Sequence, residues 1–445
     1  MNSALQSPKI VIIGGGPAGS LLANYLGKGG YEVDVYEMRD DLRSAEIGRG
    51  RSINLALSYR GLCAMAPVGL TEEVMRLAVP MRGRMIHSLQ GDIAFQSYGV
   101  DDSQAINSVS RSGLNAALLN AAEQYPSVRL HFNSKCNDIR LDNGEVTIID
   151  TKSGEASQVR GDVVASADGA FSTVRRAMQK LDRLNYSQTY LEHGYKELTI
   201  PSTRNGEFAL NKNALHIWPR QSFMMIALPN FDGSFTCTLF WPFEGPNSFA
   251  AIQTATDLHR LFETQFPDAL PLMPTLAEDY FANPVGSMVT LRCSPWHVGG
   301  QVVLLGDACH AVVPFYGQGM NAAFEDVLVI SECMDKHSPD WLGVFESYEA
   351  SRKPNTDALA DLAVANFIEM RDRTGSRLFL LRKKWEKLLG KLFPRWYIPL
   401  YTLVTFTRTP YAQAVVRARR QNRIVASIVG VVLGLMILIL WGYML

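Results

Sequence analysis

The sequence predicts an α/β protein in which a Rossmann-like nucleotide-binding domain is interrupted by an inserted antiparallel β domain. A C-terminal helical region and one transmembrane helix are expected to follow. Three observations support this class. A glycine loop follows an apolar run near the N-terminus, a second glycine motif follows an apolar run far along the chain, and the final stretch of the chain is apolar and uncharged.

The N-terminal glycine loop predicts a dinucleotide site. Gly14–Gly19 follows the apolar run Ile10–Ile13 and fits the pattern G-x-G-x-x-G. Such a loop joins a strand to a helix whose N-terminus accepts a pyrophosphate. Glu37 ends the next apolar run, where an acid can bind a ribose hydroxyl. The predicted cofactor contacts from this unit are Gly14, Gly16, Ala18, Gly19 and Glu37.

Two further acid–glycine pairs follow predicted strands, at Asp168-Gly169 and Gly306-Asp307. An aspartate in such a place can bind the ribityl chain of a flavin, although each pair alone is also a common turn. Gly319, Met320 and Asn321 begin a predicted helix, whose N-terminal amides and dipole would stabilise negative charge on a reduced flavin. The order of the three motifs favours a flavin over a nicotinamide as the bound cofactor.

The middle of the chain has a different residue composition. Leu215–Trp218, Phe223–Leu228 and Phe235–Trp241 are rich in β-forming residues and separated by proline, asparagine and glycine, which predicts an antiparallel sheet. Met81–Tyr98 is similarly rich in β-forming residues and is expected to pair with this sheet. The expected domains are 1–75, 101–190 and 290–350 for FAD binding, 76–100 and 191–289 for the substrate, 351–423 for the helical region and 424–445 for the anchor.

The C-terminal stretch Ile424–Leu445 predicts a single membrane span. It has 22 residues without a charge, and four arginines between Arg417 and Arg423 precede it. That length crosses the hydrocarbon core, and the basic flank places the preceding chain on the cytosolic side. A buried core helix is the alternative interpretation, but such a helix rarely lacks polar residues over this length.

Composition excludes several other classes. Lysine plus arginine equals aspartate plus glutamate, at 43 each, so the charge balance gives no reason to expect nucleic-acid binding. The six cysteines are scattered and form no C-x-x-C pair, so we expect no disulfide framework, no metal site and a reducing compartment.

The three glycine motifs resemble those of the flavoprotein aromatic hydroxylases, which are single-component monooxygenases. Within that family the sequence looks like the membrane-anchored members that act on kynurenine. Tyr316 departs from the pattern, because some members carry histidine there, which leaves open any role for an imidazole beside the flavin. The stretches that carry the resemblance are Gly50–Leu57, Met81–Met85, His193–Leu198, Ala214–Pro219, Val313–Asn321, Asn366–Met370 and Pro399–Phe406.

The resemblance implies hydroxylation of L-kynurenine with FAD as cofactor and NADPH and O2 as co-substrates, through a flavin C4a-hydroperoxide. It adds Arg39, Ala56 and Arg111 to the predicted cofactor contacts. Because the flavin itself performs the oxygen chemistry, no catalytic side chain is expected, and His216 and His310 are interpreted as structural. The resemblance also implies a lipid membrane as partner (mitochondrial outer membrane in a eukaryote, inner membrane in a bacterium) and allows a homodimer.

The substrate contacts can be argued physically as well. An amino-acid carboxylate calls for a guanidinium, which meets it with two parallel hydrogen bonds, and Arg84 is the candidate. Tyr98 and Tyr401 can add hydroxyl donors. The alternatives are a solvated strand for Arg84 and ordinary core for the tyrosines. The resemblance favours the substrate role and extends it to Phe315, Asn366 and Glu369, although the last two could be a solvated helix face.

Two other functions remain open at this point. Another membrane-bound flavin monooxygenase, such as a lipid epoxidase, would also need an anchor, but its pocket should be wholly apolar. A membrane-tethered flavoprotein without catalysis is the second, and only formation of an oxygenated product distinguishes it from an enzyme.

Overall fold

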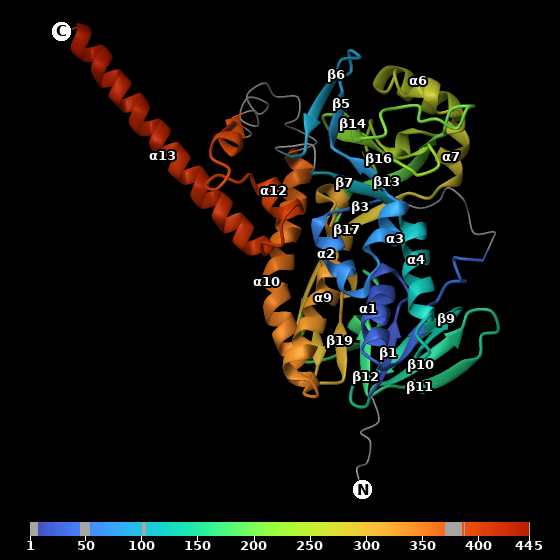
Figure 1. The fold of residues 1–445 in the computed structure, drawn as a ribbon. Coiled ribbons are helices and arrows are strands. Elements are labelled where there is room, and N and C mark those ends of the chain that lie inside the picture. The colour runs from blue at the N-terminus through green and yellow to red at the C-terminus, as the bar shows by residue number, and fades with distance from the viewer. Residues whose placement is uncertain (1–7, 45–53, 100–103, 370–384, 387, 445) are drawn as a thin grey trace.

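The computed structural model describes residues 8–44, 54–99, 104–369, 385–386 and 388–444 (Figure 1). Its centre is a six-stranded sheet in the order β18-β19-β12-β1-β2-β8, parallel except for the edge pair β18–β19. The central strands are buried runs of valine and isoleucine, as expected for a sheet covered on both faces. Its strands are β1 (Lys9–Ile13), β2 (Glu32–Tyr36), β8 (Val128–His131), β12 (Val163–Ser166), β18 (His297–Val298) and β19 (Val302–Leu304).

Helices pack around this central sheet, and two small sheets lie beside it and above it (Figure 1). The order β1–α1–β2 confirms the strand and the helix predicted on either side of the glycine loop. The helices are α1 (Pro17–Lys28), α2 (Tyr59–Met65), α3 (Thr71–Arg76), α4 (Arg111–Glu123), α5 (Thr173–Met178), α8 (Asp307–His310), α9 (Gly319–His337) and α10 (Trp341–Ile368). The small antiparallel sheets are β3 (Asn54–Leu57), β7 (Ile106–Ser110) and β4 (Val79–Met81), and β9 (Ser134–Arg140), β10 (Glu145–Asp150) and β11 (Ala156–Arg160).

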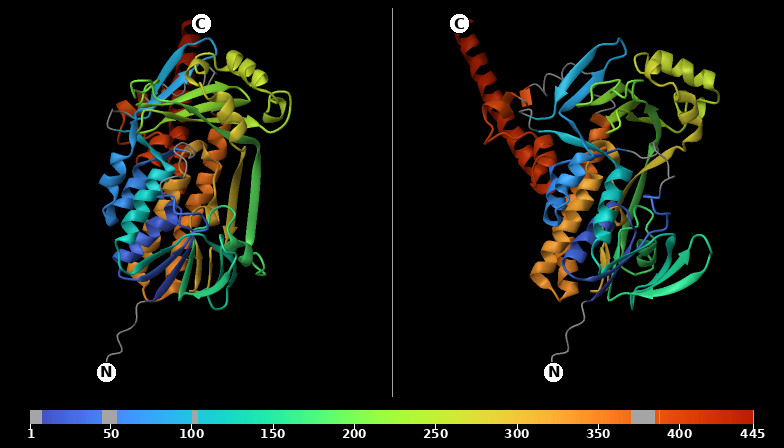
Figure 2. Two further views of the ribbon diagram at one scale, coloured as in Figure 1. Left: turned by 90° about the vertical axis from the view of Figure 1, so that its right-hand side faces the viewer. Right: turned by 45° about the vertical axis from the view of Figure 1, so that its right-hand side comes forward.

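A seven-stranded sheet, in the order β17-β13-β16-β15-β14-β5-β6, lies above the nucleotide-binding part (Figure 2). It confirms the predicted inserted sheet and its pairing with the stretch from Met81 to Tyr98. One pair differs from the expectation, because β5 runs parallel to β14. The elements are β5 (Gly83–His87), β6 (Ile93–Ser97), β13 (Asn185–Ile200), β14 (Ala214–Arg220), β15 (Phe223–Pro229), β16 (Phe235–Pro242), β17 (Gly286–Ser294), α6 (Ala255–Gln265) and α7 (Leu276–Ala282), with short 3-10 turns at Ala66–Val68, Phe249–Ala251, Leu270–Leu272 and Pro314–Tyr316.

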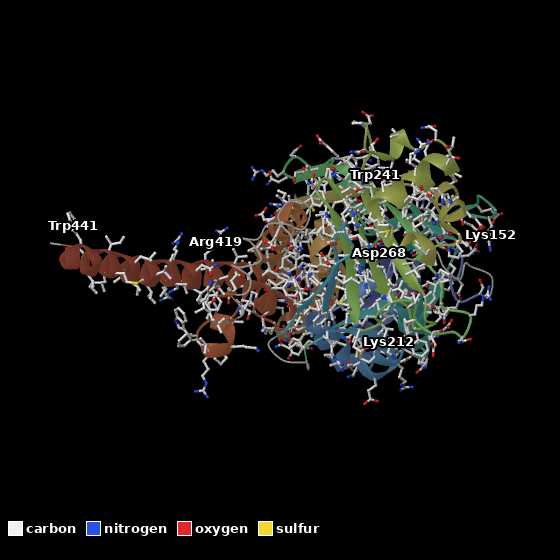
Figure 3. All side chains as sticks on the ribbon, turned by 90° about the horizontal axis from the view of Figure 1, so that it is seen from above. Lys152, Lys212, Trp241, Asp268, Arg419 and Trp441 are labelled. Carbon is white, nitrogen blue, oxygen red and sulfur yellow. The ribbon has the colours of Figure 1, made fainter. Side chains whose placement is uncertain are left out.

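The C-terminal part contains α12 (Leu400–Thr405) and α13 (Tyr411–Met444). The beginning of α13 packs on the body, where Tyr411, Ala414 and Ala418 are buried. Its distal part projects away from the body and ends near Trp441 (Figure 3). The expected border at residue 424 therefore falls inside one continuous helix.

Four of the other expected borders also fall inside elements, and two of these, at 75/76 and 350/351, lie within α3 and α10. β13 begins before residue 190 and β17 continues past residue 289, so both strands of the large sheet reach into segments assigned to FAD binding. β4, in contrast, pairs with β7 in a small sheet of the nucleotide-binding part. The division into domains thus remains a prediction, with the large sheet extending from residue 185 to residue 294 in this part of the chain.

Candidate active site

The glycine loop after β1 has the backbone geometry of a phosphate cradle. Gly14 has a φ of +101°, and a Cβ there would lie 2.5 Å from the carbonyl oxygen of Ala167. A Cβ on Gly19 would lie 2.0 Å from the carbonyl oxygen of Gly14, so α1 can pack this closely only with glycine. Beside Gly16, in contrast, no described atom lies within 4 Å of the Cβ position. The loop is tight on its protein side and open where a pyrophosphate would bind.

Glu37 closes the loop at the end of β2. Its Oε2 accepts a hydrogen bond of 2.9 Å from the Gly15 N–H, and its Oε1 accepts one of 2.7 Å from Nε of Arg39. Burial works to raise the pKa of Glu37, but the hydrogen bonds and charge of Arg39 outweigh it and hold that pKa below its usual range. Glu37 is therefore ionised at neutral pH and can accept hydrogen bonds from a ribose.

Two side chains that the sequence analysis missed hold the loop from behind. The Gly15 carbonyl accepts hydrogen bonds from Ser20 Oγ at 3.0 Å and from Asn115 Nδ2 at 2.9 Å. Both residues are buried, on α1 and α4. A polar residue on the buried face of an otherwise apolar helix was the only signal in the sequence that could have found Asn115.

The other two motifs lie at the carboxyl ends of neighbouring strands, since β12 pairs with both β1 and β19. Asp168 accepts hydrogen bonds from Ser166 Oγ and from the Thr173 N–H, at 2.5 and 2.8 Å. Asp307 is open to solvent. Desolvation by the surrounding protein raises the pKa of Asp307, while the positive charges of His310 and Arg111 oppose the rise.

A buried network of charges lies beneath Gly306. Asp326 accepts from the Gly306 N–H at 3.1 Å, contacts His310 Nε2 at 2.5 Å and accepts from Arg352 Nε at 2.7 Å. Arg352 also donates to Glu325 at 2.6 Å, and Glu325 accepts from Arg60 at 2.8 Å. This network, which the sequence analysis did not predict, fixes the Gly306 turn and accounts for His310 as a structural residue.

The N-terminus of α9 faces β3. The Asn321 side chain donates to the carbonyls of Ala56 and Gly317, at 2.8 and 2.9 Å, and accepts from the Ser58 N–H at 2.9 Å. The Asn321 side chain thus hydrogen-bonds to three backbone groups and holds these segments together. No side-chain cap satisfies the first amides of α9 among the described residues, so the amides of Gly319 and Met320 remain available for an electron-rich ring.

Arg84 lies on β5 at the centre of a polar cluster. Its guanidinium carbon is 5.4 Å from the ring centre of Tyr98 and 5.1 Å from that of Tyr401, and these two rings stack 5.5 Å apart. Arg84 Nε is shielded from solvent and has no hydrogen-bond partner within the described ranges. Burial raises the pKa of Tyr98 and of Tyr401, so both hydroxyls stay protonated at neutral pH. The cluster thus brings a guanidinium and two protonated hydroxyls together, and a carboxylate can accept hydrogen bonds from all three.

Aromatic side chains line the neighbouring space. Phe315 lies 4.9 Å from Phe240 and 4.3 Å from Phe367, measured between ring centres. Asn366, on α10, donates to the Phe315 carbonyl at 2.7 Å and so holds the turn before α9. Glu369, directly after α10, acts electrostatically on Tyr316, whose pKa burial raises.

The two halves of the site meet at Ala56. One apolar cluster contains Ala56 together with Tyr98 and Tyr401, and Tyr316 lies 5.8 Å from Tyr401. Gly317, the next residue, would place a Cβ 3.2 Å from the Cβ of Ala56. The polar cluster around Arg84 is therefore adjacent to the backbones at the N-terminus of α9. The open glycine loop, the exposed Asp307 and the uncapped N-terminus of α9 form a cradle that fits FAD.

Comparison with known proteins agrees with this cradle. Residues 8–363 match the family described as FAD binding domain. Kynurenine 3-monooxygenase of Myxococcus xanthus is 49% identical over 412 residues, covering 93% of this chain and 89% of that protein. The enzyme of Sus scrofa is 46% identical over 426 residues, covering 95% and 89%. The chain belongs to the kynurenine 3-monooxygenase family. It is an FAD-dependent monooxygenase.

Solved structures share the fold of this kynurenine 3-monooxygenase family member at lower identity. 2-Methyl-3-hydroxypyridine-5-carboxylic acid oxygenase superposes with a TM-score of 0.67 at 20% identity, covering 84% of this chain and 95% of that one. p-Nitrophenol 4-monooxygenase from Pseudomonas putida gives 0.66 at 20% identity, covering 86% and 94%. The likeness shows a common fold.

The predicted contacts of the family site remain predictions, but the structure gives most of them a place. Only parts of two matching stretches, Gly50–Ile53 and Met370, lie outside the described residues. His216 contacts His87 Nε2 at 2.9 Å and the Asn211 carbonyl at 2.9 Å through its two ring nitrogens. Both nitrogens are therefore engaged within the large sheet.

Proposed function

We propose that this protein hydroxylates L-kynurenine at the ring carbon ortho to the amine, giving 3-hydroxykynurenine, with NADPH and O2 as co-substrates. The observation that carries the proposal is the cluster of Arg84, Tyr98 and Tyr401, with its hydrogen-bond donors, beside the FAD cradle. Family membership supports the same reaction.

Arg84 would bind the amino-acid carboxylate of kynurenine. Its unpartnered Nε supports this role, because a buried donor without a partner costs about 1–3 kcal/mol and a bound carboxylate removes that cost. The protonated hydroxyls of Tyr98 and Tyr401 would donate to the same carboxylate. A lipid epoxidase has no use for these three donors, so they argue against that alternative.

The aromatic wall would hold the aniline ring and exclude bulk water. Phe315, Phe240 and Phe367 form one packed group on the side of the cluster that leads to α9. Asn366 keeps Phe315 in place through the Phe315 carbonyl. Exclusion of water matters because activated oxygen would otherwise be released as hydrogen peroxide.

No protein base is needed, because the aniline amine already activates the ortho ring carbon. Transfer of hydride from NADPH and activation of O2 are chemistry that bound FAD supplies. The chain's own residues would bind the carboxylate, orient the ring and stabilise negative charge at the N-terminus of α9.

We also propose that α13 anchors the enzyme in a membrane, with the catalytic body on the cytosolic side. Within α13, Tyr411–Ile439 is long and apolar enough to cross a bilayer, and no residue of its most apolar stretch is buried in the structure. We expect the full chain to resist carbonate extraction and a chain ending at Arg423 to be released with FAD bound. Retention of the truncated chain in the membrane pellet would refute the anchor.

The function is tested by NADPH consumption in the detergent-solubilised, FAD-loaded full chain. L-Kynurenine should raise the rate, and 3-hydroxykynurenine should accumulate. If the protein is yellow but consumes NADPH at the same rate with and without kynurenine and forms no oxygenated product, it is instead the non-catalytic flavoprotein.

A further inference from the structure

An exposed apolar surface lies beside α13, and neither the reaction nor the anchor accounts for it. Its five members are exposed by 41–61%, a high value for such large apolar side chains. We call them the aromatic ledge: Trp385, Leu388, Leu392, Phe393 and Trp396.

The ledge has the pattern of one helix face. Trp385, Leu388 and Leu392 are spaced three and four residues apart, which places them on one side of a helix. The Phe393 N–H donates to the Leu389 carbonyl at 2.8 Å, as in an α-helical turn. Lys391 and Arg395, also exposed, put positive charge between these apolar residues.

Two contacts fix the height of the ledge along α13. Tyr397 Oη donates to Asn422 Oδ1 at 3.0 Å, and Gln421 Nε2 donates to the Trp396 carbonyl. The two α13 partners, Gln421 and Asn422, lie three and two residues before Ile424, where the uncharged stretch begins. At a rise of about 1.5 Å per residue, Trp396 is level with the start of that stretch to within about one helical turn.

This height is where a bilayer changes from headgroups to hydrocarbon, if α13 spans as proposed above. Tryptophan is enriched in that zone, interfacial helices bury tryptophan, phenylalanine and leucine there, and lysine and arginine reach from it to anionic headgroups. Arg419, Arg420 and Arg423 on α13 are exposed at the same level. This combination of basic and aromatic residues matches the chemistry of a lipid interface.

We infer that the aromatic ledge is a second membrane contact, lying in the interfacial zone of an anionic bilayer while α13 crosses it. The ledge is joined through Tyr397 and Ile398 to α12, which carries Tyr401. A body held by a span and a ledge has one fixed orientation on the membrane, whereas a single helix leaves it free to tilt. The inference rests on the proposed anchor.

The test uses the full chain in vesicles of phosphatidylcholine with a minority of phosphatidylglycerol. Cysteine replaces Leu392 in a Cys63→Ser background, because Cys63 is the one native cysteine that is not buried. A polarity-sensitive fluorophore is attached, and quenchers are placed near the headgroup or deep in the acyl chain. Leu433→Cys in α13 reports on the anchor, and Leu342→Cys, 43% exposed at the start of α10, is the control on the body.

We expect the Leu392→Cys label to be quenched strongly by the shallow quencher and weakly by the deep one. Leu433→Cys should show the reverse, and Leu342→Cys should be quenched by neither. If the Leu433→Cys label is quenched and the Leu392→Cys label is not, the ledge inference is wrong and the anchor stands, and a ledge covered by protein would give this result. If only Leu433→Cys fails, the anchor is wrong and the ledge binds lipid alone; if both fail, both proposals are wrong.

Discussion

Arg84→Ala should weaken kynurenine binding without affecting FAD. The guanidinium lies beside the stacked rings of Tyr98 and Tyr401, and its Nε has no hydrogen-bond partner among the residues that the structure describes. Removing a charged hydrogen-bond partner of a carboxylate costs about 1.5–3 kcal/mol, which raises Kd roughly ten- to hundredfold. Arg84→Lys should recover only part of the loss, because an ammonium keeps the charge but lacks the planar pair of donors.

The matched control is Arg82→Ala, since Arg82 comes two residues earlier and is exposed. Kynurenine affinity is measured by titrating the flavin absorbance of each FAD-loaded variant. Flavin content and melting temperature are recorded for each, so that misfolding is not mistaken for lost binding. An Arg84→Ala enzyme with the affinity of the Arg82→Ala enzyme would refute the assignment of the carboxylate site.

Three further predictions follow from the structure. Gly14→Val should purify with little flavin, because its Cβ would meet the Ala167 carbonyl, whereas Gly113→Ala, with no contact closer than 3.7 Å, should stay yellow. Phe315→Ala should release more hydrogen peroxide per NADPH consumed, and an unchanged ratio would argue against the water-excluding wall. Burial lowers the pKa of His216 to about 4, so the unfolded state binds the extra proton first. The lowered pKa contributes up to about 3 kcal/mol to the free energy of unfolding above pH 6.5, and this contribution should be lost as the pH falls toward 4. The His216→Gln variant should therefore show a flatter dependence of melting temperature on pH in this range.

The glycine motifs could be predicted because their chemistry is local. A φ of +101° at Gly14 and the close packing at Gly19 are properties of a few neighbouring residues, and the pattern G-x-G-x-x-G records them directly. Ser20 and Asn115 support the same loop from two helices far apart in sequence. Nothing near either residue indicates that they share the Gly15 carbonyl.

The charge network shows the limit of sequence reasoning more strongly. Arg60, Glu325 and Arg352 are ordinary charged residues in the sequence, and only the packing of α2, α9 and α10 makes them a buried chain. The parallel pairing of β5 with β14 is also invisible to alternation patterns, which indicate a strand but not its direction. Likewise, the uncharged stretch from Ile424 predicts a span but not that its helix begins at Tyr411, where tertiary contacts start.

The most direct test of the central claim is the fate of labelled dioxygen. The FAD-loaded full chain is given NADPH, L-kynurenine and oxygen-18 gas, and the product is analysed by mass spectrometry. The account predicts 3-hydroxykynurenine carrying one labelled oxygen on the ring, formed in step with NADPH consumption. Hydrogen peroxide as the sole oxygen product, with kynurenine recovered unchanged, would contradict it.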